Sequence, residues 1–179
     1  MTCIAAVIDK GIVYMGADSV GAEVETYHTL PRKDPKVFLR KSFIFGFTDS
    51  FRMGQLLAHK LEIPRLPEDG VSHKWMCTEF IDNVRTCLQK GGWEKKKEER
   101  ESGGTFLVGI AGHLYVIEAD FPVGIPRYEY VAVGCGRDCA MGSLHSTKGQ
   151  QPKIRIKKAL AAAEEFSGYV RGPFVILKA

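Results

Sequence analysis

Three residues near the start of the chain have side chains that could act together on a carbonyl group. Thr2 carries a hydroxyl, Asp18 a carboxylate and Lys36 an ammonium group. A threonine hydroxyl is a weak nucleophile until a neighbouring base removes its proton. Because Thr2 is small, we expect Met1 to be removed. The freed α-amine of Thr2, with a reference pKa of about 7.7–8.0, would then be a base at neutral pH. With Met1 retained, this amine is blocked.

The predicted strands would bring these three residues together. Residues 3–8 and 12–17 are short apolar, β-branched runs joined by a Lys-Gly turn, which predicts a β-hairpin. The hairpin would return Asp18 to the side of Thr2, and a strand beginning at Lys36 would add the ammonium group. A lysine there lowers the pKa of the amine and the hydroxyl, and Asp18 holds it charged and oriented. The sequence therefore predicts a centre that hydrolyses amide bonds.

The rest of the pattern predicts an α+β fold with two antiparallel sheets. Helical periodicity and capping residues predict helices over 50–60, 72–90, 138–146 and 152–166. Further strands are expected over 36–40, 42–48, 105–110, 113–118, 128–133 and 173–177. The order is strands, two helices, strands, two helices, strand, which does not fit a parallel βαβ sheet. It fits a four-layer αββα sandwich, with a helical layer outside each of two stacked antiparallel sheets.

Two polar stretches are expected to lie outside these layers. Residues 19–35 contain two prolines and are predicted to be loop or edge. Glutamates at 94, 98, 99 and 101 flank the three consecutive lysines Lys95, Lys96 and Lys97, and this mixed charge indicates a solvated loop or helix end. With no linker or repeat in sight, we expect one domain spanning residues 1–179.

Composition excludes several classes of protein. Apolar residues at 45% and charged residues at 26% are typical of a globular chain. No apolar run approaches the roughly 20 residues that span a bilayer, and the start lacks the features of a secretory signal. We therefore expect a cytoplasmic protein with no membrane partner. The net charge of +4 is dispersed and forms no patch of one sign, which argues against a nucleic-acid partner.

The cysteines and histidines predict neither a disulfide framework nor a metal site. The number of cysteines is odd and no CxxC pair occurs, and the five histidines lack ligand spacing. We expect no metal or organic cofactor. The cysteines are Cys3, Cys77, Cys87, Cys135 and Cys139.

Ordered motifs carry a resemblance to a known family. The segment 2–7, followed by Gly-Ala-Asp-Ser at 16–19, resembles the start of proteasome β-type subunits. It also resembles the peptidase of the bacterial two-component ATP-dependent protease. Similar motifs recur in order over nearly the whole chain, at 34–38, 45–48, 132–136 and 163–168. The resemblance implies an N-terminal-nucleophile (Ntn) hydrolase, with peptide or unfolded-protein substrates and a homo-oligomeric ring. It leaves open whether an ATPase is a partner.

The resemblance also implies roles for individual residues. Thr2 matches the nucleophile, and Asp18 with Lys36 matches the charged pair beside it. Ser19 matches a residue that often follows the aspartate. Residues implied to support the amine and its water are Cys135, Glu164 and Ser167. A backbone N–H in the turn 48–50 would supply the oxyanion hole, with Asp49 or Ser50 near the family's glycine.

Departures from the family pattern leave alternatives open. Cys135 stands where the family usually has serine, and Glu164 where it usually has aspartate. A catalytically silent, ring-forming subunit and a small-molecule amidase are both compatible with these residues. Trimming of two residues would instead expose Cys3 as an N-terminal nucleophile. In the plainest interpretation Asp18 closes a turn, Lys36 is an edge-strand charge and Glu164 is a surface carboxylate.

Overall fold

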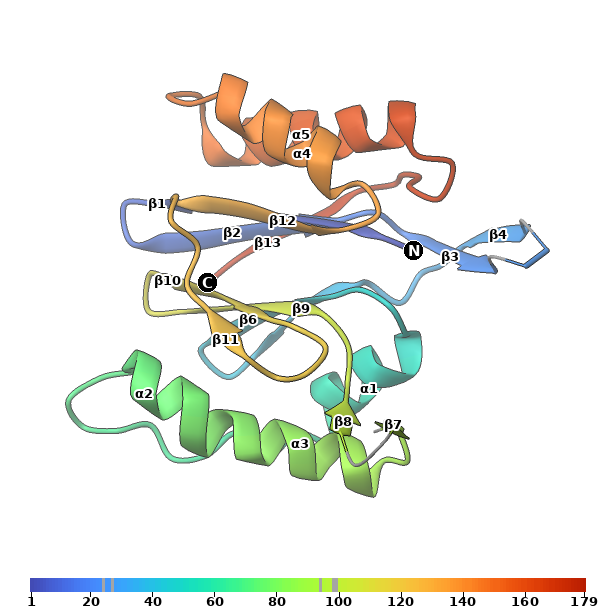
Figure 1. Cartoon of the computed structure of the whole chain (residues 1–179). Helices are drawn as coiled ribbons and strands as arrows, with labels where there is room; N and C mark the ends of the chain where they lie inside the picture. The colour runs from blue at the N-terminus through green and yellow to red at the C-terminus, as the bar shows by residue number, and fades with distance from the viewer. Residues whose placement is uncertain (24, 27, 94, 98–99) are drawn as a thin grey trace.

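A computed structural model describes residues 1–23, 25–26, 28–93, 95–97 and 100–179, with backbone alone for 95–97 and 100–101. Two antiparallel sheets lie face to face, and helices cover the outer side of each (Figure 1). The predicted α+β, αββα sandwich is therefore confirmed. No helix in the described ranges has the length and apolar character needed to cross a bilayer.

The first sheet has four strands in the order β12-β1-β2-β13. Helices α4 and α5 pack on its outer face (Figure 1). Its strands are β1 (Cys3–Asp9), β2 (Ile12–Ala17), β12 (Tyr130–Gly134) and β13 (Val175–Lys178), and its helices are α4 (Arg137–Ser146) and α5 (Pro152–Phe166). The predicted hairpin of β1 and β2 is confirmed, with Ile4 opposite Ala17 and Asp9 opposite Ile12.

The second sheet has five strands in the order β11-β10-β9-β6-β5, and it lies between the first sheet and the remaining helices. Its strands are β5 (Val37–Arg40), β6 (Phe43–Phe47), β9 (Phe106–Ile110), β10 (His113–Ile117) and β11 (Val123–Gly124). Helix α1 (Phe51–His59) is followed by α2 (His73–Trp75), which continues through a π-helical turn (η1, Met76–Phe80) into α3 (Ile81–Lys90). Ser72 caps α2, and Ser50 rather than Asp49 caps α1; each serine side chain accepts a backbone N–H.

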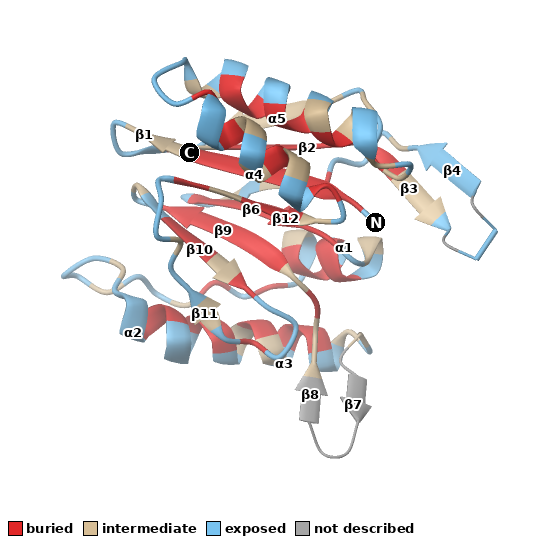
Figure 2. Ribbon diagram, turned by 45° about the horizontal axis from the view of Figure 1, so that its top comes forward, coloured by how far each residue is buried: buried red, intermediate tan, exposed pale blue. Residues whose placement is uncertain are grey.

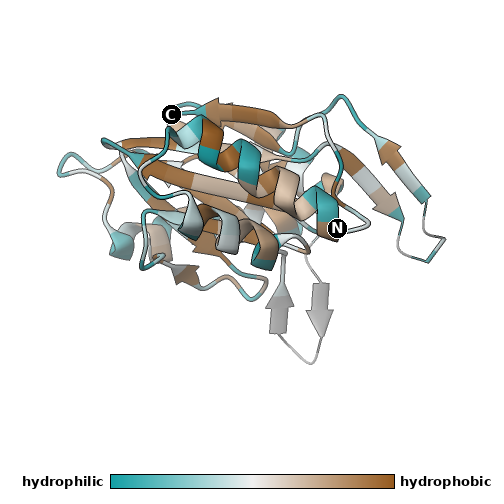
Figure 3. Ribbon diagram, turned by 90° about the horizontal axis from the view of Figure 1, so that it is seen from above, coloured by the Kyte–Doolittle hydropathy of each residue, from teal (hydrophilic) through white to brown (hydrophobic). Residues whose placement is uncertain are grey.

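Strand β1 is buried on both faces because it belongs to an inner layer (Figure 2). Cys3, Ala5 and Val7 pack toward α4 and α5, whereas Ile4 and Ala6 pack toward the second sheet. A strand covered on both sides has a nearly continuous apolar sequence, which is what the start of the chain shows. Seen from above, hydrophilic and hydrophobic residues alternate along the covering helices, while the strands are mainly hydrophobic (Figure 3).

The two polar stretches that were predicted to lie outside the layers both form hairpins. Strands β3 (Val20–Glu23) and β4 (His28–Pro31) pair with each other and project from the sheets (Figure 1). Strands β7 (Lys95–Lys97) and β8 (Arg100–Ser102) also pair, so the prediction of a loop or helix end there is wrong. The predicted counter-charges at 94, 98 and 99 lie outside the described residues. Strand β4 is exposed throughout, so it lacks the apolar alternation that would have marked it.

Candidate active site

Thr2 lies at the entrance to β1 and is almost fully buried. Its hydroxyl donates to the carbonyl oxygen of Met1, and its own carbonyl oxygen accepts the thiol of Cys135 at 3.4 Å. Strand β12 approaches so closely that a Cβ on Gly134 would lie 2.1 Å from the Thr2 carbonyl oxygen. Gly134 also has a φ of +95°, which favours glycine. The Thr2 backbone is thus held in place by close contacts with the end of β12 and with Cys135.

Asp18 follows β2 and has both carboxylate oxygens engaged in the interior. One oxygen accepts the Cys3 backbone N–H at 3.0 Å, and the other accepts that of Val20 at 3.1 Å. The Lys36 ammonium donates to both, at 3.0 and 2.9 Å. Hairpin pairing of β1 with β2 explains the placement, because it returns the end of β2 to the start of β1. This carboxylate therefore holds both the first strand and the lysine.

Lys36 directly precedes β5, and its side chain is 1% exposed. Burial lowers the pKa of Lys36, while the charge and hydrogen bonds of Asp18 act in the opposite direction. The ammonium nitrogen also lies 3.4 Å from the carbonyl oxygen of Met1. That carbonyl carbon is bonded to the Thr2 nitrogen, so the positive charge lies beside the peptide bond that precedes Thr2. The three residues singled out from the sequence are brought together.

The turn after β6 offers a backbone donor near Thr2. The N–H and hydroxyl of Thr48 both donate to the carbonyl oxygen of Thr105, and the N–H of Ser50 donates to that of Thr48. Within the described ranges, the N–H of Asp49 has no acceptor. Asp49 has a φ of +56°, and its carboxylate accepts the Thr105 N–H at 2.7 Å, which fixes the turn. A cavity of about 40 Å³ joins this turn to Thr2, and it is lined by Met1, Thr2, Ala22, Phe47, Thr48, Asp49, Ser50 and Phe51.

Comparisons with known proteins show the same fold elsewhere. No family model matches the sequence, and no curated protein matches it. Among solved structures, Thiobacillus denitrificans BPH in complex with epoxomicin has a TM-score of 0.79 at 16% identity, covering 99% of this chain and 98% of that one. A second BPH structure from Thiobacillus denitrificans has a TM-score of 0.80 at 15% identity, covering 99% and 97%. Eukaryotic HslV from Trypanosoma brucei has a TM-score of 0.69 at 16% identity, covering 99% and 98%.

The chain has the fold of HslV and BPH. This confirms the proteasome-type Ntn-hydrolase fold that the ordered motifs predicted. At 15–16% identity the likeness establishes the fold, and the chemistry has to be argued from the side chains themselves.

Of the other residues predicted for the candidate site, Cys135 and Ser167 lie together. The Cys135 sulfur is 3.5 Å from the Ser167 hydroxyl and also contacts the Thr2 carbonyl oxygen. Cys135 directly follows β12, and Ser167 directly follows α5. The two side chains therefore link the start of the chain to the covering helix layer.

Ser19 and Glu164 instead contact the segment 171–173. The Ser19 hydroxyl donates to the carbonyl oxygen of Pro173, and the Glu164 carboxylate accepts the N–H of Gly172 at 2.8 Å. No hydrogen bond joins either side chain to Thr2 in the part of the chain that is described. Both residues thus fix the segment leading into β13.

Cys3 is poorly placed as the nucleophile of this HslV-type fold. Its side chain is fully buried, and burial, with a further contribution from the Asp18 charge, raises the pKa of its thiol to about 12. A thiol that stays protonated at neutral pH is a weak nucleophile.

The described residues contain no group of three or more His, Cys, Asp or Glu suited to hold a metal ion.

Sequence reasoning missed two residues, one that holds the turn and one that lines the small cavity. Thr105 acts through its backbone, and a backbone acceptor leaves no mark in the residue pattern. Phe51 lines the cavity, and its ring centre lies 5.8 Å from the Lys36 ammonium. A hydrophobic position in the first turn of a helix would not by itself have distinguished Phe51 from a core residue.

Proposed function

We propose that this chain is a proteasome-like threonine endopeptidase, in which Thr2 is the nucleophile once Met1 has been removed. One observation carries the proposal. The buried Lys36 ammonium, held by both oxygens of Asp18, lies 3.4 Å from the carbonyl oxygen of the peptide bond that this removal would break. The freed amine of Thr2 would therefore stand next to a fixed positive charge. That charge lowers the pKa of the amine and favours its neutral, basic form.

The proposed reaction follows from these positions. The Thr2 hydroxyl oxygen attacks the peptide carbonyl carbon, and its proton passes to the α-amine, directly or through one water. The Asp49 N–H, free of other acceptors in the described chain, donates to the oxyanion that forms. When the intermediate collapses, the carbon–nitrogen bond breaks and the amine returns the proton to the leaving group. Water then attacks the acyl ester, and Thr2 is regenerated.

Neighbouring side chains are assigned positioning roles. Cys135 and Ser167 contact each other beside the Thr2 carbonyl and would orient the amine and its water. Ser19 and Glu164 would act indirectly, because they hold the segment 171–173.

We further propose a homo-oligomeric ring whose chamber admits unfolded protein, since an ungated peptidase would digest its folded neighbours. The proposal needs no cofactor, and an ATPase partner stays an expectation from the resemblance.

The experiment combines mass and activity on the same sample. The purified chain is weighed by mass spectrometry, and hydrolysis of fluorogenic peptides is measured with and without epoxomicin, the ligand in the BPH complex. We expect Met1 to be absent, hydrolysis to occur and epoxomicin to inhibit it. Thr2→Ala should lower turnover by at least about 10³-fold. Thr78→Ala, at an exposed helix position, serves as the matched control.

Each alternative has its own outcome in this experiment. Unchanged peptide hydrolysis in Thr2→Ala would rule out the proposed mechanism. An intact Met1 with no hydrolysis would identify a silent subunit, and hydrolysis of small amides without peptides would identify an amidase.

A further inference from the structure

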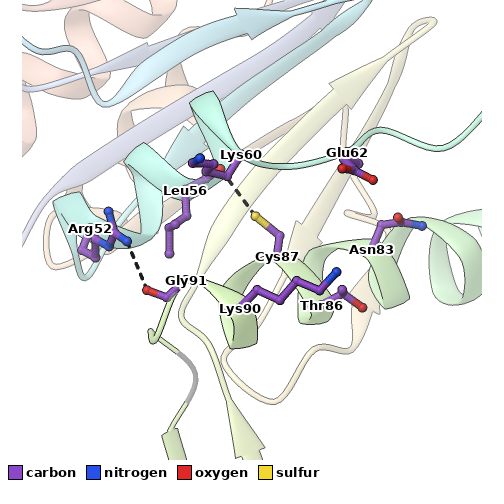
Figure 4. Close-up of a pocket in the computed structure, with 9 residues that line it drawn as sticks. All are labelled: Arg52, Leu56, Lys60, Glu62, Asn83, Thr86, Cys87, Lys90 and Gly91. Carbon is purple, nitrogen blue, oxygen red and sulfur yellow. Dashed lines mark hydrogen bonds between the residues drawn. The ribbon is translucent and has the colours of Figure 1, made fainter.

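A second cavity lies between helices α1 and α3, and it shares no residue with the one at Thr2. It has a volume of about 350 Å³, within the range of small-molecule sites. Figure 4 shows side chains from both helices and from the segment after α1 around it. We call it the α1–α3 pocket. It is lined by Arg52, Leu56, Lys60, Glu62, Asn83, Thr86, Cys87, Lys90 and Gly91.

The charges around the α1–α3 pocket are mostly positive and mostly unpaired. Three cations, Arg52, Lys60 and Lys90, face one carboxylate, Glu62. The ammonium group of neither lysine has a salt bridge or hydrogen bond to any residue in the described ranges. Arg52 donates one N–H to the carbonyl oxygen of Gly91 at 3.1 Å, which fixes the guanidinium at the edge of the pocket (Figure 4). A positive, partly pre-organised rim of this kind favours an anion.

The floor of the α1–α3 pocket is apolar. Leu56 and Cys87 are 2% and 8% exposed, so little of either side chain is in contact with solvent. The Cys87 thiol donates to the carbonyl oxygen of Leu56 at 3.5 Å, which satisfies its hydrogen-bonding capacity (Figure 4). No polar group of these two side chains needs a further partner, so an apolar ligand surface can cover them at no hydrogen-bonding cost.

The three cations of the rim are all placed at the carboxyl ends of helices. Lys60 and Lys90 lie at the carboxyl ends of α1 and α3, where a cation complements the negative end of the dipole. Arg52, however, is the second residue of α1, at the positive end of that helix. Its guanidinium group nevertheless donates to the carbonyl oxygen of Gly91, the C-cap residue of α3, so its charge also lies at the negative end of a helix dipole. Among the described residues, no carboxylate pairs with any of the three cations, so their charges are available to an anion in the cavity that they share.

We propose that the α1–α3 pocket binds an amphipathic organic anion. The apolar body of this ligand covers Leu56 and Cys87, and its carboxylate or phosphate group is bound by the cations of the rim. Glu62 limits the negative charge that the pocket accepts. The site is independent of the chemistry proposed for Thr2.

The test compares two fluorescent probes that share an apolar body. 8-Anilinonaphthalene-1-sulfonate carries a negative group, and N-phenyl-1-naphthylamine is its uncharged counterpart. We expect saturable binding of the anionic probe and binding of the neutral one weaker by about tenfold or more, since a charge-assisted hydrogen bond contributes roughly 1.5–3 kcal/mol. Equal affinity for both probes would overturn the proposal.

Matched variants locate the site. Lys60→Met with Lys90→Met should weaken anionic-probe binding by about tenfold or more, and Glu62→Gln should strengthen it about twofold. Lys153→Met with Lys157→Met removes the same charge from the exposed face of α5 and should leave binding unchanged. Circular dichroism verifies that each variant is folded. Unchanged binding in the folded Lys60/Lys90 variant would overturn the assignment, as would an equal loss in the α5 control.

Displacement identifies the head group. Octanoate and octyl phosphate should displace the anionic probe, whereas octanol at the same concentration should not. The stronger of the two competitors tells whether the ligand class is a carboxylate or a phosphate. Displacement by octanol as effective as by either anion would show a merely apolar site. The same measurements in Thr2→Ala separate this binding from hydrolysis.

Discussion

Two ion pairs formed from neighbouring stretches of sequence have opposite environments. Arg32 and Asp34 meet at 2.6 Å with side chains 33% and 46% exposed. Lys36 and Asp18 meet at 2.9 Å with side chains 1% and 0% exposed. Lys36 is only two positions after Asp34, yet the chain passes from the surface into the interior between these two residues. The same kind of ion pair is therefore solvent-exposed in one case and buried in the interior in the other.

The difference shows what burial does to a charge. In water, an exposed pair gains little, because solvent and salt screen it and two long side chains must be ordered. In the interior, each charge depends on its partner, and losing one leaves the other without compensation. Burial also lowers the pKa of Lys36, and the charge and hydrogen bonds of Asp18 oppose that shift. Substitutions at each ion pair test this difference.

The largest effect is expected at the buried pair. Lys36→Met keeps a similar length but leaves Asp18 with only its two backbone donors. We expect the free energy of unfolding to fall by about 3–5 kcal/mol, measured by urea denaturation followed through tryptophan fluorescence. Hydrolysis, if Thr2 is the nucleophile, should fall by at least about 10²-fold in the folded protein.

Lys33→Met is the matched control, because Lys33 is exposed and three residues away. Its unfolding free energy should stay within about 0.5 kcal/mol of the original. A loss below about 1 kcal/mol in Lys36→Met would mean that water reaches the buried pair, and the contrast between the two environments would disappear.

The sequence was sufficient to predict the layers and the proximity of Thr2, Asp18 and Lys36. Apolar runs on both sides of a short turn marked the β1–β2 hairpin, and hairpin geometry then placed Asp18 beside Thr2. Caps and 3.6-residue periodicity marked the helices, since Ser50 and Ser72 are strong capping residues. These features are local, so they can be read without knowledge of the tertiary structure.

What the sequence could not supply depends on distant contacts. Glu164 was expected near the amine, and its actual contact with Gly172 depends on the path of the chain into β13. The carbonyl of Thr105 holds the turn at Thr48 across 57 positions. Strands β3 and β4 pair with each other, and because β4 is exposed throughout, no apolar alternation in its sequence marks it as a strand. The rim of the α1–α3 pocket likewise combines Arg52 with Lys90 through helix packing.

An effect of intermediate size on the unfolding free energy tests whether water reaches the interior beside the Lys36–Asp18 pair. The thiol of Cys3, whose N–H is bound by Asp18, has its pKa raised from 9.0 to about 12, chiefly by burial. An elevated folded-state pKa gives stability that is complete below the unfolded value and is lost as the pH rises through this window. Between pH 8 and pH 10, the original protein should lose about 1.4 kcal/mol more unfolding free energy than Cys3→Ala does. Parallel urea denaturation at the two pH values measures this, and identical losses would indicate a solvated thiol.

The smallest effect is expected at the exposed pair. Asp34→Asn removes the carboxylate but keeps a polar group of similar size, and Arg32 retains its stacking on Phe51, with the guanidinium carbon 3.9 Å from the ring centre. We expect a loss of about 0.5 kcal/mol or less at low salt, and none at 1 M salt, because screening removes what the pair contributes. The Arg32 hydrogen bond lowers the pKa of Asp34, so this contribution is present above the unfolded-state pKa and is lost as the pH falls through the folded-state value. Thermal unfolding at two salt concentrations measures the difference. A salt-independent loss above about 2 kcal/mol would show that this pair, too, is structural, and burial would then no longer separate the two.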